Sequence, residues 1–164
     1  MVKILDYAMQ MEKDGEKYYR DLADQCGDTG LATILNMLAD AEVKHYNVLQ
    51  QMGKKRPVQL EEGTIRDDVK NIFARMMESG EENDFSMSEV ELYKRAQQLE
   101  QRSRDFYEEK AEECDSPADE EIFYQLADEE ELHYQLLDSI VEFISRPLPG
   151  NWLENAEWYH SEEY

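Results

Sequence analysis

The chain has 164 residues, enough for one domain with a sizeable core. Its 39 acidic residues outnumber its 17 basic ones, which gives a formal net charge of −22. A surface this acidic repels phosphate groups and attracts small cations, so we expect no nucleic-acid partner and no membrane partner. No apolar run approaches the ~20 residues of a membrane span. Because the first residues also lack the apolar region of a signal peptide, a cytoplasmic location is expected.

The first half of the chain predicts two amphipathic helices. Each has one stripe of apolar residues at the 3.6-residue spacing of a helix face, and each stripe also contains residues that ionise. The first stripe has Leu5, Ala8, Glu12, Gly15, Tyr19 and Leu22, and the second has Leu31, Leu35, Leu38, Glu42, His45, Leu49 and Met52.

Residues 53–87 form a long connection with an amphipathic helix of its own. The apolar face of this predicted helix has Ile65, Val69, Ile72, Phe73 and Met76. Met76 and Met77 are interpreted as packing residues. The spacing therefore predicts a helical crossover between the two halves of the chain.

The second half predicts two more helices. Ser88 with Glu91, and Ser116 before Pro117, have the residue types that begin helices. The two stripes are Leu92, Ala96, Glu100, Ser103, Tyr107, Ala111 and Cys114, and then Ile122, Leu126, Glu130, His133, Leu137, Ile140 and Ile144. We expect one domain over residues 1–146 and a short helical docking tail over residues 147–164. His160, in that tail, is expected to be a surface residue.

The two halves are related by an internal repeat. A shift of 88 residues lays MEKDGEKYYRDLADQC (11–26) on LEQRSRDFYEEKAEEC (99–114) and LADAEVKHYNVL (38–49) on LADEEELHYQLL (126–137), without a gap. Two helix pairs joined by a long link predict an all-α four-helix bundle with one crossover between its second and third helices. The halves are then related by a two-fold axis across the bundle. This axis brings the ionisable stripe residues of both halves together at mid-height.

Four carboxylates and two imidazoles in an apolar core need a compensating partner, because buried like charges repel strongly. Two divalent cations would balance four glutamates, and Glu and His three residues apart face the same way on a helix. Mixed carboxylate and imidazole ligands suit iron or manganese. The alternative is a set of core polar residues that bond one another. The candidate ligands are Glu12, Glu42, His45, Glu100, Glu130 and His133.

The segments MEKDGEKYYRDLA, LADAEVKHY and LADEEELHY resemble the helix signatures of the rubrerythrin branch of the ferritin-like superfamily, over about residues 3–145. The resemblance implies a ferritin-like bundle whose two iron ions, or manganese or mixed metals, are held by the same six residues. It also implies reduction of hydrogen peroxide or oxidation of Fe(II), by peroxide or dioxygen. The chain has no C-x-x-C pair for a rubredoxin-type iron site, so a separate electron donor, such as a rubredoxin-like protein, is expected.

Two positions depart from relatives of this kind. Rubrerythrins carry an extra glutamate where this chain has Ser103, whose repeat mate is Gly15. The absence of this glutamate weighs against efficient peroxidase turnover. It leaves a symmetric site that resembles that of bacterioferritin. Val43 stands where bacterioferritin has its haem-ligating methionine, so no haem is expected.

Other residues near the predicted centre have two interpretations each. Tyr19 and Tyr107 either act in catalysis, by hydrogen-bonding a ligand or quenching an oxidising equivalent, or are plain core aromatics. Glu129 either orients His45 or is exposed to solvent. Cys26 and Cys114 are each expected ~21 Å from the centre, at opposite ends of the bundle, and so cannot form a disulfide within the chain.

The leading functional hypothesis is redox chemistry at a non-haem di-iron centre, as a peroxidase or ferroxidase. A second hypothesis is a non-catalytic metal carrier or iron buffer with the same dinuclear site. A third is an interaction module that binds no metal. The apolar tail and the crossover helix favour a homodimer.

Overall fold

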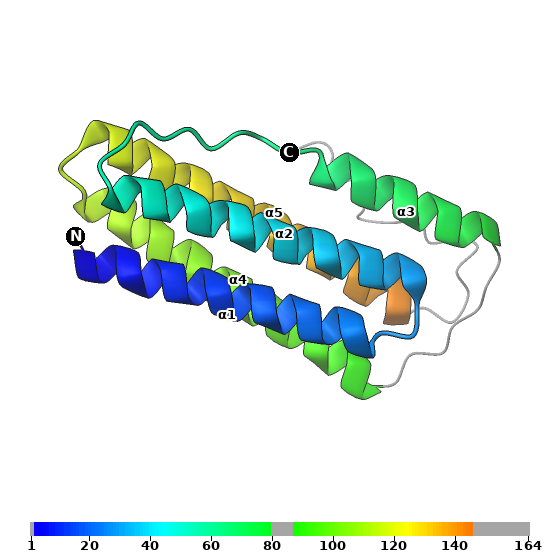
Figure 1. Ribbon diagram of the computed structural model, residues 1–164. Helices are drawn as coiled ribbons and strands as arrows, with labels where there is room; N and C mark the ends of the chain where they lie inside the picture. The colour runs from blue at the N-terminus through cyan, green and yellow to red at the C-terminus, as the bar shows by residue number, and fades with distance from the viewer. Residues whose placement is uncertain (1, 80–86, 146–164) are drawn as a thin grey trace.

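The computed structural model of the protein describes residues 2–79 and 87–145. This part of the chain folds into five helices with no strand among them (Figure 1). They are α1 (Val2–Gln25), α2 (Thr29–Gly53), α3 (Ile65–Ser79), α4 (Met87–Glu113) and α5 (Pro117–Ser145). The predicted all-α fold is confirmed. None of the described helices combines the length and the apolar character that crossing a bilayer requires. The expected docking helix and His160 lie outside the described residues.

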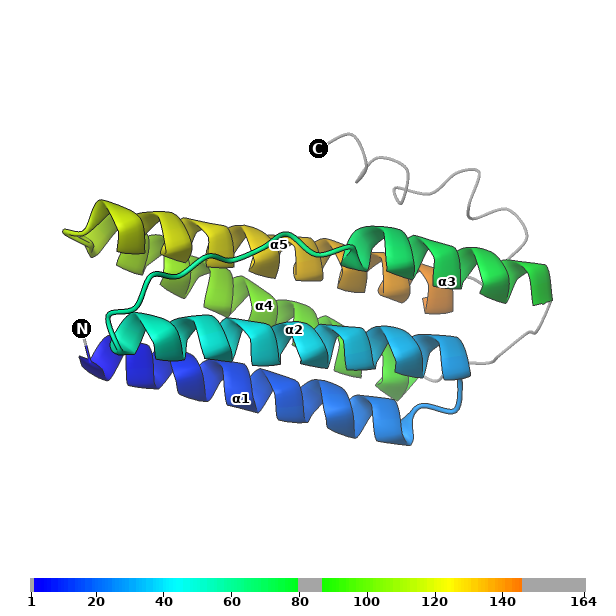
Figure 2. The ribbon, with the colours of Figure 1, turned by 45° about the horizontal axis from the view of Figure 1, so that its top comes forward.

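Four of the helices form the bundle. α1 packs along α2 and α4 packs along α5, and the two pairs face each other with α1 antiparallel to α4 (Figures 1 and 2). Residues 54–64, here called the crossover segment, run back along the bundle over α2 and α5 and lead into α3 (Figure 2). This arrangement is the ferritin-like bundle with one crossover, as predicted.

Side chains cap the starts of two helices, one of which, at Ser116, the sequence predicts. At the start of α2, the carboxylate of Asp28 accepts a hydrogen bond from the N–H of Leu31 at 2.9 Å. At the start of α5, the Ser116 hydroxyl accepts one from the N–H of Asp119 at 3.3 Å. Such caps satisfy backbone donors that have no partner inside the helix. The prediction for Ser88 is wrong: α4 begins at Met87, so Ser88 lies inside the helix rather than before it.

α3 covers one end of the bundle through the face that its periodicity predicts. Val69, Ile72 and Phe73 are buried in a core cluster that also contains residues of all four bundle helices. Met76 and Met77 pack against the same cluster, as interpreted from the sequence. Gly30 allows this close approach, because a Cβ atom built there would lie 2.5 Å from the sulfur of Met76.

The apolar core consists of two clusters with the ionisable residues between them. One cluster includes Leu35 and Ile140 and is covered by α3, and the other includes Leu5 and Phe123 and is covered by Leu60 of the crossover segment. The cysteines are free: Cys26 packs against the first cluster and Cys114 against the second. They therefore lie toward opposite ends of the bundle.

We predict that the packing of α3 contributes strongly to stability. Phe73 is fully buried and its ring lies 5.1 Å from that of Phe143 in α5. Phe73→Ala is expected to lower the free energy of unfolding by about 3–5 kcal/mol, because it removes apolar burial and leaves a cavity. Urea unfolding followed by circular dichroism measures the change. Tyr124→Ala, at a ring 40% exposed on α5, is the control and should cost less than about 1 kcal/mol; equal losses would show that α3 is not part of the cooperative core.

Candidate metal centre

The six residues predicted as ligands lie together in one layer at mid-height of the bundle. α1 and α4 each contribute one glutamate, and α2 and α5 each contribute a glutamate and the histidine one turn later. All six are 0–3% exposed. Because each stands near the middle of a helix whose stripe faces the core, burial of the neighbouring leucines brings them together. They are Glu12, Glu42, His45, Glu100, Glu130 and His133.

The geometry follows the two-fold relation between the halves. The Nδ1 atom of His45 lies 2.9 Å from an oxygen of Glu130 and 3.5 Å from one of Glu12. In the other half, Nδ1 of His133 lies 3.5 Å from oxygens of Glu42 and Glu100. The two imidazole rings are nearly parallel, with centroids 5.7 Å apart and an angle of 10° between their planes.

These residues form two overlapping groups that could each hold a metal ion. In each group, one ligand atom per residue can be chosen so that all lie within 4.8 Å of one another. Glu42 and Glu130 belong to both groups, whereas Glu12 belongs only to the group of His45 and Glu100 only to that of His133. The geometry favours the α2 and α5 glutamates as the shared pair.

The donor atoms fit a pair of metal ions. Oε2 of Glu12 and Glu100, Oε1 of Glu42 and Glu130, and both nitrogens of each histidine are buried without a hydrogen-bond partner. Buried polar atoms are rarely left unpaired, since each costs about 1–3 kcal/mol. Here the carboxylate oxygens and the two Nδ1 atoms converge from four helices on one small volume, and carboxylate oxygen and imidazole nitrogen are the ligands that iron and manganese accept.

Two tyrosines connect the halves of the centre. The hydroxyl of Tyr107 on α4 donates to Oε1 of Glu12 on α1 at 2.6 Å. Reciprocally, the hydroxyl of Tyr19 on α1 donates to Oε1 of Glu100 on α4. Burial raises the pKa of both phenols well above 10, and the neighbouring carboxylates raise it further, so both stay protonated as donors. The tyrosines predicted near the centre therefore contact it directly, through the two glutamates that are not shared.

Electrostatics divide the four carboxylates into two kinds. Burial, and then the charges of other glutamates, raise the pKa of Glu42 and Glu130 well above the usual 4.5. Burial acts in the same direction on Glu12 and Glu100, but attraction to the histidines and donated hydrogen bonds outweigh it; the pKa of Glu12 is lowered and that of Glu100 falls to about 2. In the metal-free protein, protons on the shared pair therefore limit the buried negative charge.

Two small residues lie beside the ligands on the α1–α4 side of the centre. Ser103 and its repeat mate Gly15 line one cavity with Glu42, Glu100 and Glu130. A Cβ atom at Gly15 would lie 3.1 Å from Oε2 of Glu42, so glycine makes room for a shared carboxylate.

Glu129 is half-buried rather than fully exposed, and lines a second cavity with His45 and His133. The other wall of that cavity includes Gly63 and Thr64 of the crossover segment, which were not predicted to lie near the centre. No periodicity in that segment indicated where it would lie.

The fold and the centre together define the class of the protein: a helical bundle with a buried carboxylate and imidazole cluster suited to two metal ions. A model of the rubrerythrin family matches residues 3–141 of the chain. The chain therefore belongs to the rubrerythrin family, as the sequence motifs predicted. Comparison with curated proteins and with solved structures found no match.

The raised pKa values of Glu42 and Glu130 predict a pH dependence for the metal-free protein. A carboxyl group whose pKa is raised by folding stabilises the fold fully below its unfolded value near 4.5, and this contribution is lost as pH rises through the folded pKa. As the pH rises above about 5, the free energy of unfolding is therefore expected to fall, by at most about 1.4 kcal/mol per pH unit for each group that is protonated only in the folded state. Urea unfolding at a series of pH values measures the decline.

A matched variant separates this effect from the general acidity of the chain. The double variant Glu42→Gln, Glu130→Gln is neutral at these positions at every pH, and should flatten the decline. Glu108→Gln, which removes a half-exposed carboxylate on α4, should leave it as steep as in the parent protein. The same slope in all three proteins would contradict the raised pKa values.

Gly15 offers a test of the space around Glu42. Gly15→Ala is expected to raise the free energy of unfolding of the metal-free protein by up to about 1 kcal/mol, because alanine favours the helix more than glycine does. It should also weaken metal binding about tenfold or more, because the new methyl group displaces the Glu42 carboxylate. Competition with a chelator measures affinity, and thermal unfolding measures stability. Ser103→Ala, at the repeat mate, is the control that should keep its affinity; equal affinities in the two variants would overturn the prediction.

Proposed function

We propose that the protein is a non-haem di-iron redox protein of the rubrerythrin type, which oxidises Fe(II) with hydrogen peroxide or dioxygen. The observation that carries the proposal is the pair of overlapping ligand groups, which share Glu42 and Glu130 and each have one further glutamate and one histidine. Two adjacent Fe(II) ions can together deliver the two electrons that reduce peroxide to water. The four carboxylates match the total charge of two divalent cations.

The residues of the chain have separate proposed roles. Glu42 and Glu130, which belong to both ligand groups, would hold both ions, and their raised pKa values mean that these carboxyl groups would release protons on cation binding. Glu12 with His45, and Glu100 with His133, complete the two ligand sets. Tyr107 and Tyr19 hold Oε1 of Glu12 and Glu100, which leaves Oε2 of each buried without a hydrogen-bond partner and free to bind an ion.

A cavity of about 290 Å³ supports access by a small oxidant. It lies between α1 and α4, and its walls include Glu42, Glu100 and Glu130. Gly15 and Ser103 also line it, and both are small. Peroxide and dioxygen are small enough for such a space, whereas a protein electron donor is not. We therefore propose that a separate donor, such as a rubredoxin-like protein, binds at the surface. From the sequence features described above, we also propose that the protein acts as a cytoplasmic homodimer.

The alternative is a metal carrier or iron buffer in which oxidation is incidental. Ser103 favours this alternative, because it leaves the cavity without the additional carboxylate that rubrerythrins have there. The two functions differ in turnover: a peroxidase returns to the Fe(II) state with a reductant and reacts again, whereas a carrier oxidises its iron once.

Anaerobic loading with Fe(II), followed by stopped-flow mixing with hydrogen peroxide, tests the proposal. We expect about two irons per chain, oxidation within seconds, and repeated turnover when a reductant is added. Glu42→Ala and Glu130→Ala should each abolish oxidation of a bound pair, because each removes a ligand from both groups.

The control for these variants is Glu108→Ala, which removes a carboxylate 51% exposed on α4 and should behave as the parent protein. Oxidation of about two irons without turnover would favour the carrier. Failure to bind iron, with the Glu42 and Glu130 variants unchanged, would exclude both metal functions.

A further inference from the structure

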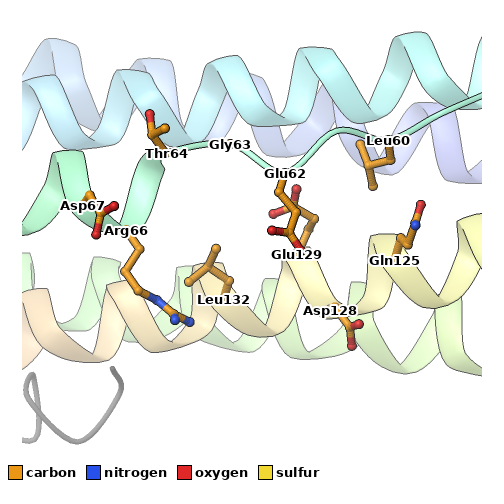
Figure 3. Close-up of a pocket in the computed structure, with 10 residues that line it drawn as sticks. All are labelled: Leu60, Glu62, Gly63, Thr64, Arg66, Asp67, Gln125, Asp128, Glu129 and Leu132. Atoms are coloured by element: carbon orange, nitrogen blue, oxygen red, sulfur yellow. The ribbon is translucent and has the colours of Figure 1, made fainter. Parts of the chain in front are cut away.

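The centre has a second cavity on the side opposite the α1–α4 cavity. This cavity, of about 250 Å³, lies under the crossover segment, and its walls include His45 and His133. It adjoins a larger cavity of about 530 Å³ between the crossover segment and α5 (Figure 3). The two share Gly63, Thr64 and Glu129. We call them together the crossover groove.

The walls of the crossover groove are strongly acidic. Among its charged side chains only Lys44 and Arg66 are basic, and Lys44 donates to the backbone oxygen of Glu61. Figure 3 shows the crossover segment carrying Glu62 over α5, which carries Asp128 and Glu129. These three carboxylates have no ion-pair partner within the described part of the chain. The acidic residues of the groove are Asp40, Glu62, Asp67, Asp68, Asp128 and Glu129.

The inner end of the groove has unpaired nitrogen ligands. Nδ1 of His45 and of His133 faces the glutamates of the centre, so Nε2 lies on the other edge of each ring. Both Nε2 atoms are buried without a hydrogen-bond partner, in side chains only 1% and 0% exposed, and both rings line the groove. A neutral imidazole nitrogen is a good ligand for a divalent transition metal.

The opposite cavity has a different charge. Its walls include Arg95 and Arg102 beside a single carboxylate at the surface, Asp14. Neither arginine has an ion-pair partner in the described residues. A cation approaching from that side meets two arginines and one surface carboxylate. One approaching through the crossover groove meets six carboxylates and two basic side chains, and only Asp40 of the six is paired with an arginine, Arg20.

We propose that hydrated divalent cations, such as Fe²⁺ or Mn²⁺, reach the centre through the crossover groove. The outer carboxylates concentrate the cation, Glu129 lies beside the ligand Glu130, and the Nε2 edges of the two imidazoles that line the groove are the first nitrogen contacts. The inference rests on the metal centre of the proposed function but not on its redox activity. It also gives Glu129 a role that its repeat mate, Ala41, cannot have.

Uptake of Co²⁺ tests the route without any redox step. Stopped-flow absorption at low ionic strength follows the formation of the bound ion in the full chain. The groove variant Glu62→Gln, Asp128→Asn, Glu129→Gln should lower the association rate about five- to tenfold, because it removes three charges along the path. The final content of about two ions per chain should not change. Salt at 0.5 M should reduce the difference in rate, because it screens charges that are more than about 4–5 Å apart.

The matched control is Asp6→Asn, Glu112→Gln, Glu121→Gln, which removes three exposed carboxylates outside the groove. Its rate should fall less than about twofold. If the groove and control variants slow uptake equally while both still bind two ions, the route is wrong and the metal centre stands. If the parent protein binds no Co²⁺, Fe²⁺ or Mn²⁺, the proposed centre fails as well.

A steric test distinguishes the two sides directly. A Cβ atom at Gly63 meets no other atom within 4 Å, so Gly63→Trp can fill the groove without forcing the crossover segment away. It should slow Co²⁺ uptake with no change in final content. Asp14→Trp, at an exposed position on the wall of the α1–α4 cavity, should leave uptake unchanged. The reverse result would place cation access between α1 and α4.

Discussion

The burial of four carboxylates in one layer of the bundle is the constraint on which the rest of the structure depends. Each would be costly alone in an apolar core, and together they repel. The structure offers three kinds of compensation: imidazole nitrogens beside the oxygens, phenol hydroxyls from Tyr19 and Tyr107, and raised pKa values at Glu42 and Glu130. None of these supplies partners for all the buried oxygen and nitrogen atoms. Cation binding is the interaction that would.

The apolar clusters on either side of this layer fix its position. Because helix packing sets the backbone, the ligands do not need to pull the helices together. The centre is therefore preorganised by leucines and aromatics several residues away from it, such as Leu35 and Phe123. Preorganised ligands keep their spacing when the charge between them changes, which a redox centre requires.

Much of this could be predicted from the sequence, because it depends on periodicity. The 3.6-residue stripes and the repeat placed Glu12, Glu42 and their mates in one buried layer, and the structure has them there. Which glutamates are shared could not be predicted, since spacing along a helix does not determine how side chains of different helices meet. The course of the crossover segment was also unpredictable, because residues 54–64 have no regular secondary structure. The start of α4 was misjudged at Ser88, since a serine inside a helix and one that caps it look alike in sequence.

The reciprocal bonds of Tyr107 to Glu12 and of Tyr19 to Glu100 mean that each half completes the other. In this respect the chain resembles an isologous dimer whose two subunits have been joined. In a true dimer, every substitution appears on both sides of the axis at once. Joining the subunits removes that restriction. The chain shows the result at two pairs of equivalent positions in the repeat: Glu129 corresponds to Ala41, and Arg95 corresponds to Tyr7. One covalent link thus lets a symmetric set of ligands have surroundings that differ on its two sides.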